Sequence, residues 1–336
     1  MAENYKITTF ASHTALQILK GAKDEGFGTV LLCPADRKKF YSLFPLADKT
    51  IQLNDLNSLK DASEKIAEDN AILVPHGSFV ANGNLKELQQ LDIMYFGNRK
   101  ILPWESDRSL ERKWLKESGI KIPRLYKNPE DIDRPVIVKF FGAEGGKGYF
   151  LTKSREDFEK KIKESRGKQY QLQEYIVGVP IYIHYFHSPL SGETEIMSCD
   201  RRWETNVDAI GRIAAKDQID LSLESSYSVV GNAPLVLRES LLPKALEMGE
   251  RVVETSRKLV DRKGLFGPFC LEGVLTPKME FFVFEISARI VAGTNLFING
   301  SPYTWLKYNK SVSTGRRIAM EIKQAIQESR IEEVLG

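Results

Sequence analysis

Apolar runs alternate with amphipathic segments along the N-terminal third of the chain. The runs are short and bounded by polar residues or glycine, a pattern typical of buried strands. Residues 12–27 have the apolar spacing of an amphipathic helix with Ser12 as its N-cap. Because strands and helices alternate, we predict a parallel sheet. The runs predicted as its strands are 5–10, 29–33, 51–53, 71–75 and 92–96.

The order of elements changes near residue 106. From there onward, predicted strands often follow one another directly and helices are fewer, which indicates an α+β domain. A small unit of two strands, a helix and a further strand, at about 130–178, is set inside this domain. We therefore predict two domains, 1–105 and 106–336, and a combined α/β plus α+β fold class. The main predicted elements of the second domain are helices at 157–165 and 242–262 and strands at 170–177 and 268–286.

Composition and charge exclude several classes of partner. The 336 residues are 42% apolar and 28% charged, and the net charge is only +3 with no run of five like charges, so nucleic acid is not an expected partner. Three distant cysteines, with no CxxC pair, indicate neither a zinc site nor a disulfide framework. The N-terminal segment lacks a signal-peptide core, and no apolar run is long enough to span a membrane. We expect a cytoplasmic protein.

A glycine-rich loop with two lysines is the first candidate for chemistry. Lys139 ends the apolar run before the loop, and Lys147 lies within it. Exposed backbone N–H groups and lysine together favour phosphate binding. The loop is not a P-loop, because glycine follows Gly146–Lys147 where serine or threonine is required, and a protein kinase places its glycine loop before the lysine strand. A plain hairpin loop remains the alternative. The loop glycines are Gly142, Gly145, Gly146 and Gly148.

Two glutamates face each other in the predicted strand pair at 268–286. If the hairpin is symmetric about Lys278 and Met279, Glu272 lies directly opposite Glu285. Like charges in that position repel, and in a largely apolar setting one of them should be driven neutral. A cation between the carboxylates removes the repulsion, and a few oxygen ligands suit Mg²⁺. The alternative, in which each glutamate is solvated, is disfavoured for Glu285 by its apolar neighbours.

These features together resemble the ATP-grasp ligases: a lysine that ends a strand, a glycine loop in a small lid, the strand LQEYIVG and a pair of metal glutamates. The resemblance implies an ATP-grasp fold with a lid at about 130–178, preceded by an N-terminal parallel-sheet domain that holds a substrate phosphate. It implies ATP bound between the lid and a larger sheet, and a carboxylate activated as an acyl phosphate. It implies that Glu272 and Glu285 bind metal and that Lys139 and Arg289 are catalytic. Adenine is contacted by Glu174 and by the backbone of Tyr175 and Ile176. The phosphates are contacted by Lys139, Gly142, Gly145, Gly146, Lys147 and Gly148.

Three positions depart from the ATP-grasp pattern. Ser287 stands in EISAR where the metal-binding motif has asparagine, which weakens the hold on a second metal ion. Arg108 stands where the family has a lysine that contacts ATP, and arginine can still pair with phosphate. The usual ribose-binding glutamate after the hinge is absent, and we take Glu204 of RRWETN as its substitute.

A closer resemblance covers the chain from about residue 6 to residue 310. The sequence resembles the formate-dependent 5-formaminoimidazole-4-carboxamide ribonucleotide synthetases of purine biosynthesis. The resemblance implies ATP, formate and the aminoimidazole carboxamide ribonucleotide (AICAR) as substrates, with the formamido product (FAICAR), ADP and phosphate as products. It also implies Mg²⁺ or Mn²⁺, no folate, no membrane and a homotrimer or homohexamer. The segments that carry it are ASHTALQILKGAKDEGF, ILVPHGSFVA, SDRSLERKWLKESGIKIP, VKFFGAEGGKGYFL, LQEYIVGVPIYIHYF, RRWE and FEISARIVAGTNLF.

The 5′-phosphate of such a ribonucleotide needs a site of its own. His13 lies at the start of the first predicted helix, where backbone N–H groups bind phosphate. Ser78 follows another strand at the same edge of the parallel sheet, where ligands gather. The resemblance implies that His13, Ser78 and Asn232 contact the substrate. The ordinary alternatives are an N-cap for Ser12, a helix-surface histidine and a turn-forming asparagine.

Two other functions stay open on the sequence alone. An ATP-grasp ligase for another small carboxylate or nucleotide has the same motifs, because formate is too small to leave a readable pocket pattern. A nucleotide-binding regulatory protein without catalysis is the alternative from another class. The presence of Lys139, Glu272, Glu285 and Arg289 argues against lost catalysis.

Overall fold

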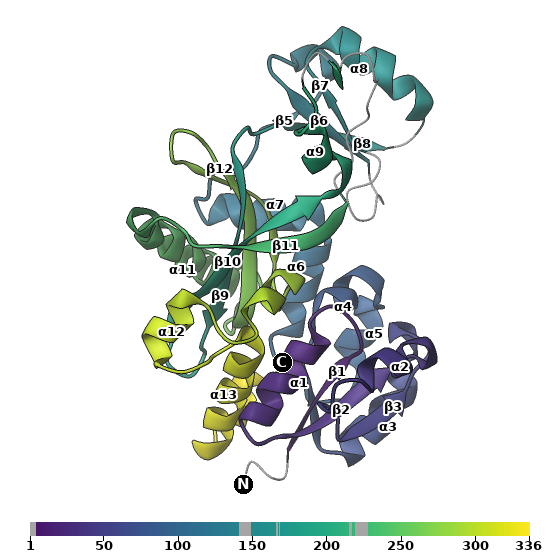
Figure 1. Ribbon diagram of the computed structural model, residues 1–336, viewed down its shortest axis with the longest axis vertical. Helices are drawn as coiled ribbons and strands as arrows, with labels where there is room; N and C mark the ends of the chain where they lie inside the picture. The colour runs from purple at the N-terminus through teal and green to yellow at the C-terminus, as the bar shows by residue number, and fades with distance from the viewer. Residues whose placement is uncertain (1–4, 141–148, 166, 168, 215–216, 219–227) are drawn as a thin grey trace.

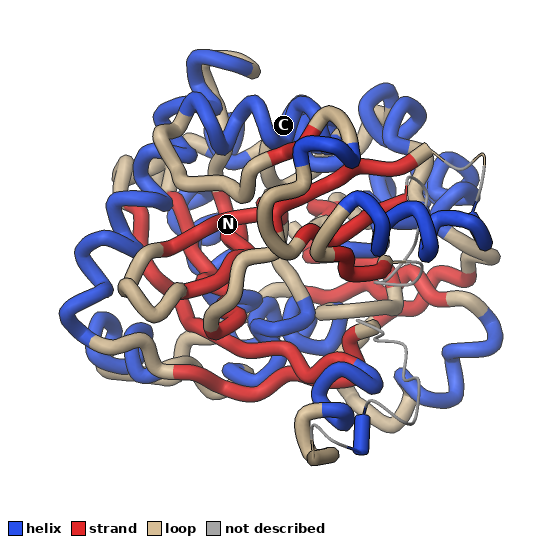
Figure 2. The backbone as a smooth tube through the Cα atoms, turned by 90° about the horizontal axis from the view of Figure 1, so that it is seen from above, coloured by secondary structure: helices blue, strands red, loops and turns tan. Residues whose placement is uncertain are grey.

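The computed structural model describes residues 5–140, 149–165, 167, 169–214, 217–218 and 228–336. Within these residues the strands form three sheets, which follow one another along the long axis of the molecule (Figure 1). Most helices lie on the outside, and strands run through the interior (Figure 2). No helix in this part of the chain is long and apolar enough to cross a membrane.

The N-terminal domain is built on a parallel four-stranded sheet, as predicted. Its strand order is β3-β2-β1-β4, and every neighbouring pair is parallel. The prediction of a fifth strand at 92–96 is wrong, because among the described residues this segment makes only isolated bridges, Leu73–Tyr95 and Phe96–Leu335. The elements are β1 (Lys6–Phe10), α1 (Ala15–Asp24), β2 (Gly28–Cys33), η2 (Ala35–Arg37), α2 (Lys38–Tyr41), β3 (Lys49–Gln52), η3 (Leu56–Ser58), α3 (Leu59–Glu68), β4 (Ala71–Leu73), α4 (Gly77–Asn82), α5 (Leu85–Gln90), η4 (Arg99–Ile101) and α6 (Leu102–Ser106).

The first helix starts later than the sequence predicts. Its N-cap position is Thr14, with no side-chain cap, so the prediction of Ser12 as N-cap is wrong. The reason is the backbone of His13, whose φ of 40° lies in the left-handed region and cannot continue a right-handed helix. Ser12 and His13 therefore lie in the turn between β1 and α1, at the carboxyl end of a parallel strand.

An antiparallel five-stranded sheet, in the order β11-β10-β9-β12-β13, forms the middle of the molecule. Helices α7 and α11 pack on one of its faces and share a buried core with it. The two helices also contact each other, because the Trp114 indole N–H of α7 donates to the Val252 carbonyl of α11 at 2.9 Å. Alternation along the strands places polar side chains on the other face. The elements are α7 (Arg108–Glu117), β9 (Val179–His187), β10 (Thr194–Glu204), α9 (Thr205–Ile210), β11 (Val229–Leu235), η7 (Glu239–Leu241), α11 (Leu242–Leu259), β12 (Gly267–Leu275), β13 (Phe281–Ser287), η8 (Ala292–Phe297) and α12 (Pro302–Tyr308).

The small unit predicted at about 130–178 is a separate four-stranded sheet with one helix, at the far end of the molecule from the N-terminal domain (Figure 1). Its order is β5-β8-β6-β7, and β6 pairs antiparallel with β7 on either side of the glycine loop, as predicted. The sheet includes β5, which lies before residue 130. The elements are β5 (Leu125–Tyr126), η5 (Pro129–Asp131), β6 (Val136–Phe140), β7 (Phe150–Thr152), α8 (Arg155–Lys161), η6 (Ile162–Ser165) and β8 (Tyr170–Glu174).

The C-terminal helix α13 (Thr314–Gln327) returns to the N-terminal domain and packs on α1, before the short α14 (Ile331–Val334). Glycines let the two backbones touch, because a Cβ on Gly21 would lie 2.2 Å from the Arg316 nitrogen and one on Gly315 would lie 2.3 Å from the Gln17 carbonyl. Apolar residues of α1, α13 and the central sheet share one buried cluster. This packing fixes the N-terminal domain against the central sheet.

Candidate active site

Two glutamates face each other across β12 and β13, as predicted. The strand register pairs Glu272 directly with Glu285. The turn is not the symmetric one assumed, since Met279 takes a left-handed φ of 58° and Leu275 lies opposite Phe281, one residue away from the predicted partner. A bulge next to Glu272 restores the expected register at the glutamate pair.

Glu272 is buried and Glu285 is exposed, although we predicted that Glu285 is shielded from solvent. Glu272 is only 2% exposed, whereas Glu285 keeps contact with solvent, so the expectation that Glu285 is shielded is wrong. The Glu285 side chain lines an open cleft between α7, β6 and β13, together with Arg108 and Lys139. Burial and the charge of Glu272 raise the pKa of Glu285 to about 7.

The contacts of Glu272 fit a divalent cation. Its Oε1 atom pairs with Arg202 Nη2 at 2.7 Å and accepts a hydrogen bond from the Ser287 hydroxyl at 3.0 Å. Its Oε2 atom is buried and has no hydrogen-bond partner among the described residues. An unpartnered carboxylate oxygen opposite a second carboxylate is a suitable ligand pair for Mg²⁺. The described residues hold no group of three or more acidic, histidine or cysteine ligands, so water and phosphate oxygens would complete the shell.

Lys139 of β6 reaches the same cleft from the small sheet. Its Nζ atom lies 5.6 Å from the ring centroid of Phe284 and 5.8 Å from that of Tyr149. It lines a pocket together with Arg108 and Glu285. Burial lowers the pKa of Lys139, and the charge of Glu285 opposes this effect. The structure thus brings together the predicted phosphate lysine, the predicted arginine and one member of the predicted metal pair.

Two buried glutamates that sequence reasoning missed bracket the end of β13. Glu111 of α7 accepts the Ile286 N–H at 2.6 Å, and Glu105 of α6 accepts the Ala288 N–H at 2.9 Å. Glu105 also pairs with Arg289 Nη2 at 2.8 Å. Burial raises the pKa of both carboxyls. They fix the backbone after Glu285 and orient Arg289, but in the sequence they are ordinary members of charged helices.

His13 and Ser78 lie together, as predicted, and Arg289 lies beside them. The Ser78 hydroxyl is 2.8 Å from His13 Nδ1. Gly77 allows this approach, because a Cβ there would lie 2.9 Å from the His13 ring and 3.5 Å from the Arg289 guanidinium carbon. Burial, then the charges of Arg289 and Arg37, lower the pKa of His13. The positive charge at this cluster therefore comes from the two arginines, and Arg37 was missed in the sequence.

A second histidine holds Ser78 in place. His76 Nδ1 accepts the Ser78 N–H at 3.3 Å, so its Nε2 carries the proton and donates to the Phe10 carbonyl at 2.7 Å. Burial lowers the pKa of His76 to about 3, and its ring stacks on His13 at 5.5 Å. His76 also bridges to Ile290, which links this cluster to the segment that carries Arg289.

Asn232 is held on the polar face of the central sheet. It lies in β11, not in a turn, and its side-chain amide donates to Asp200 Oδ2 at 2.7 Å. The other oxygen of Asp200 is 2.6 Å from His184 Nε2, and Asp200 and His184 are both buried. Asp200 and His184 were missed, since the alternation of residues along a strand gives them no special role.

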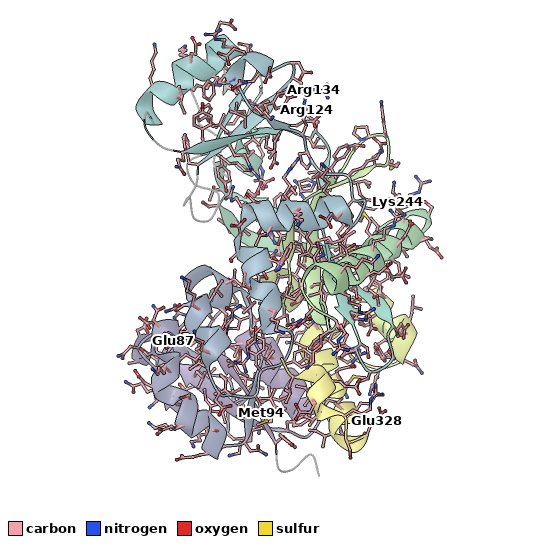
Figure 3. All side chains as sticks on the ribbon, turned by 180° about the vertical axis from the view of Figure 1, so that it is seen from behind. Glu87, Met94, Arg124, Arg134, Lys244 and Glu328 are labelled. Carbon is pink, nitrogen blue, oxygen red and sulfur yellow. The ribbon has the colours of Figure 1, made fainter. Side chains whose placement is uncertain are left out.

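The predicted adenine residues lie at the hinge between the small sheet and β9. The Glu174 carboxylate accepts the Arg124 N–H at 3.1 Å and pairs with Arg134 at 3.0 Å. Both arginines lie in the small unit (Figure 3). The Tyr175 N–H donates to the Pro135 carbonyl at 2.9 Å. In this structure both groups are engaged inside the small sheet, and the contact of Glu174 and of the Tyr175 backbone with adenine stays a prediction.

Two further predicted residues lie near this hinge. Ile176 is half-buried directly after Tyr175. Glu204 ends β10, and its charge is close enough to raise the pKa of Tyr175 after the larger effect of burial. Burial, then Asp208, raise the pKa of Glu204 itself. The loop residues predicted to contact phosphate lie outside the described part of the chain; they are Gly142, Gly145, Gly146, Lys147 and Gly148.

The chain is similar to known proteins over almost its whole length. Residues 150–336 match the family described as "Domain of unknown function (DUF1297)", and residues 7–126 match "Protein of unknown function (DUF1246)". A 5-formaminoimidazole-4-carboxamide-1-(beta)-D-ribofuranosyl 5′-monophosphate synthetase of Pyrococcus horikoshii is 57% identical over 338 residues, which cover 98% of this chain and 99% of the relative. The chain belongs to this synthetase family.

Solved structures of relatives confirm the predicted ATP-grasp fold. The IMP biosynthesis protein PurP from Thermococcus kodakaraensis superposes with a TM-score of 0.78 at 32% identity, over 98% of this chain and 100% of that chain. The biotin carboxylase domain of the Hydrogenobacter thermophilus 2-oxoglutarate carboxylase, solved with MgADP and bicarbonate, has a TM-score of 0.66 at 16% identity, over 94% and 69% of the two chains. At that identity the second likeness concerns the fold alone.

Proposed function

We propose that this synthetase joins formate to the amine of AICAR at the expense of ATP, with FAICAR, ADP and phosphate as products. A formate oxygen attacks the γ-phosphorus of ATP, and ADP leaves with the electron pair of the broken P–O bond. The amine then attacks the carbonyl carbon of formyl phosphate, loses a proton and expels phosphate. The proposal excludes folate, because formate itself supplies the one-carbon unit.

The residues of the cleft divide this work by position. Lys139 and Arg108 neutralise the transferred phosphoryl group from the small sheet and from α7. Glu272 and Glu285 would hold Mg²⁺, or Mn²⁺, which when bound neutralises charge on the β- and γ-phosphates. His13, Ser78 and Arg289 bind the ribonucleotide, and Asn232 contacts it from the central sheet. Glu204 and the hinge backbone at Ile176 bind the nucleoside part of ATP.

The observation that carries the proposal is the opposed Glu272–Glu285 pair, of which Glu285 lines one pocket with Lys139, in a chain that matches these synthetases over nearly its full length. No nucleophilic side chain is needed, since the substrate amine attacks. Formate labelled with ¹⁸O tests the acyl phosphate. One ¹⁸O atom is expected in the released phosphate, because the attacking formate oxygen stays on phosphorus. Unlabelled phosphate would contradict activation of formate by ATP.

His13→Ala is expected to separate the two nucleotide sites. Loss of a hydrogen bond to a charged phosphate costs about 1.5–3 kcal/mol, so the KM for AICAR should rise roughly 10- to 150-fold. The KM for ATP should change little, because His13 belongs to the N-terminal sheet and Lys139 to the small sheet. Initial rates against each substrate measure both values. An equal rise in both KM values would show a structural role for His13 and contradict the assignment.

Mg²⁺ affinity is expected to depend on pH through Glu285. With a pKa of about 7, this carboxyl is increasingly protonated below neutrality, so the apparent affinity should fall about tenfold per pH unit below that value and level off above it. The raised pKa also means that the folded protein binds the proton more tightly than the unfolded chain does. Stability of the metal-free protein should therefore fall as pH rises from about 4.5 to 7. Calorimetric titration and thermal unfolding check the two trends, which Glu285→Gln should abolish.

A further inference from the structure

The polar face of the central sheet joins the predicted metal pair to the predicted substrate residue. Strand register places Glu285, Glu272 and Asp200 in one row across β13, β12 and β10, with β9 between the last two. Two residues farther along β10, Arg202 lies opposite Asn232 of β11. Since alternate residues of a strand share a face, Arg202 belongs to the same polar face as Glu272.

Arg202 is held by two contacts and remains partly open to solvent. Its Nη2 atom pairs with Glu272 Oε1 at 2.7 Å, and its guanidinium carbon lies 3.8 Å from the ring centroid of Tyr182. Its side chain is 23% exposed, against 3% for the Glu272 side chain. The guanidinium is therefore fixed by a carboxylate and an aromatic ring, while part of the side chain remains accessible to solvent.

We propose that Arg202 is the residue that binds the carboxylate of formate. The inference rests on the proposed function and adds the residue that selects the small acid. Without ligands, Arg202 neutralises Glu272. With a metal ion held by Glu272, the planar fork of Arg202 would be available to bind both oxygens of formate.

The position of Arg202 agrees with what the reaction requires. Formate must lie between the γ-phosphate, beside the Glu272–Glu285 pair, and the amine of AICAR, on the side of Asn232. Arg202 contacts Glu272 and lies opposite Asn232, so it spans this interval. Bidentate binding would point one formate oxygen at the γ-phosphorus. The same donors would then stabilise negative charge on the formyl oxygen while the amine attacks.

Two other cations of the cleft are committed elsewhere. Arg289 pairs with Glu105 and lies beside Gly77 and the His13 ring, at the expected phosphate of AICAR. Lys139 approaches from the small sheet and lies next to Glu285 rather than Glu272. Arg289 is placed for the phosphate of AICAR and Lys139 for the phosphates of ATP, so Arg202 is available for the carboxylate of formate.

Steady-state kinetics of Arg202→Ala, Arg202→Lys and wild type test the proposal. For Arg202→Ala we expect the KM for formate to rise at least about 30-fold, while the KM values for ATP and AICAR stay within about twofold, because a charge-assisted bidentate contact is lost from one substrate only. Guanidinium ion added to Arg202→Ala should restore part of the formate-dependent rate. Arg202→Lys should be intermediate, since lysine keeps the charge but not the fork. Arg251→Met, an exposed arginine of α11, is the matched control.

A binding measurement gives a readout other than turnover. The resonance of ¹³C-formate should broaden on adding wild-type enzyme with Mg²⁺ and a non-hydrolysable ATP analogue, and should stay sharp with Arg202→Ala. The role of Arg202 would be refuted if Arg202→Ala kept the wild-type KM for formate and still broadened the formate resonance. An equal rise in the KM values for formate, ATP and AICAR would refute it as well. If Arg202→Ala does not fold, Arg202→Lys decides by the same two criteria. Wild-type enzyme that releases ADP without any response to formate would instead refute the proposed function itself.

Discussion

Glu285→Gln is expected to abolish turnover while leaving the fold intact. The substitution removes one of two opposed carboxylates, so the site loses a charged metal ligand and the phosphates lose their main counter-charge. We expect kcat to fall at least about a hundredfold, which corresponds to roughly 2.7 kcal/mol of lost transition-state stabilisation. Glutamine has the same shape, and Glu285 is open to solvent, so packing should not suffer.

The stability of this variant provides a second test. Without metal, Glu285→Gln relieves repulsion with Glu272, so its unfolding midpoint near pH 8 should lie slightly above that of wild type. Glu280→Gln, at the tip of the same hairpin, is the matched control, because Glu280 only pairs with exposed Lys121. Near-normal ligation by Glu285→Gln at ordinary Mg²⁺ concentrations would show that the metal lies elsewhere.

Lys139→Ala is expected to damage ATP use with little effect on AICAR binding. The variant loses the contact between a half-buried ammonium, in one pocket with Glu285, and the phosphates, which is worth about 1.5–3 kcal/mol or roughly 10- to 150-fold in the KM for ATP. Lower kcat should accompany this change, because the same charge stabilises the transferring phosphoryl group. The KM for AICAR should stay near the wild-type value. Initial rates with each substrate varied in turn give these constants.

Lys161→Ala serves as the control for this substitution. Lys161 lies in the same small sheet unit, on α8, and its ammonium contacts the Leu151 carbonyl and Asp157 at the surface. It should leave both KM values unchanged. If Lys139→Ala raised the KM values for ATP and AICAR equally, or changed neither, Lys139 would not be the residue that contacts the ATP phosphates.

Residues with a strong local signal could be predicted from the sequence. Lys139 and the glycine loop stand out because two strands flank them, and Glu272 with Glu285 stand out because a hairpin places its residues in pairs. The pair was found although the assumed turn was wrong, since a bulge beside Glu272 compensates the altered turn. The exposure of Glu285 was predicted incorrectly, because apolar neighbours along a strand do not show whether a cleft opens above it.

Residues that act through distant contacts could not be predicted. Glu105 and Glu111 look like solvated helix residues, yet they accept backbone N–H groups from the segment after Glu285, far along the chain. Asp200 has no local sequence signal of its own, and its role depends on His184 and Asn232 from neighbouring strands. Hydrophobic periodicity gives the face of an element but not its partner, so these contacts become visible only once the sheets are assembled.

ADP release in the presence of formate, AICAR and Mg²⁺, with each component omitted in turn, tests the central claim most directly. The proposed function predicts ADP release that requires all of them together, with one FAICAR formed for each ADP. Release of ADP at the same rate without formate, or without AICAR and with no FAICAR formed, would contradict the account.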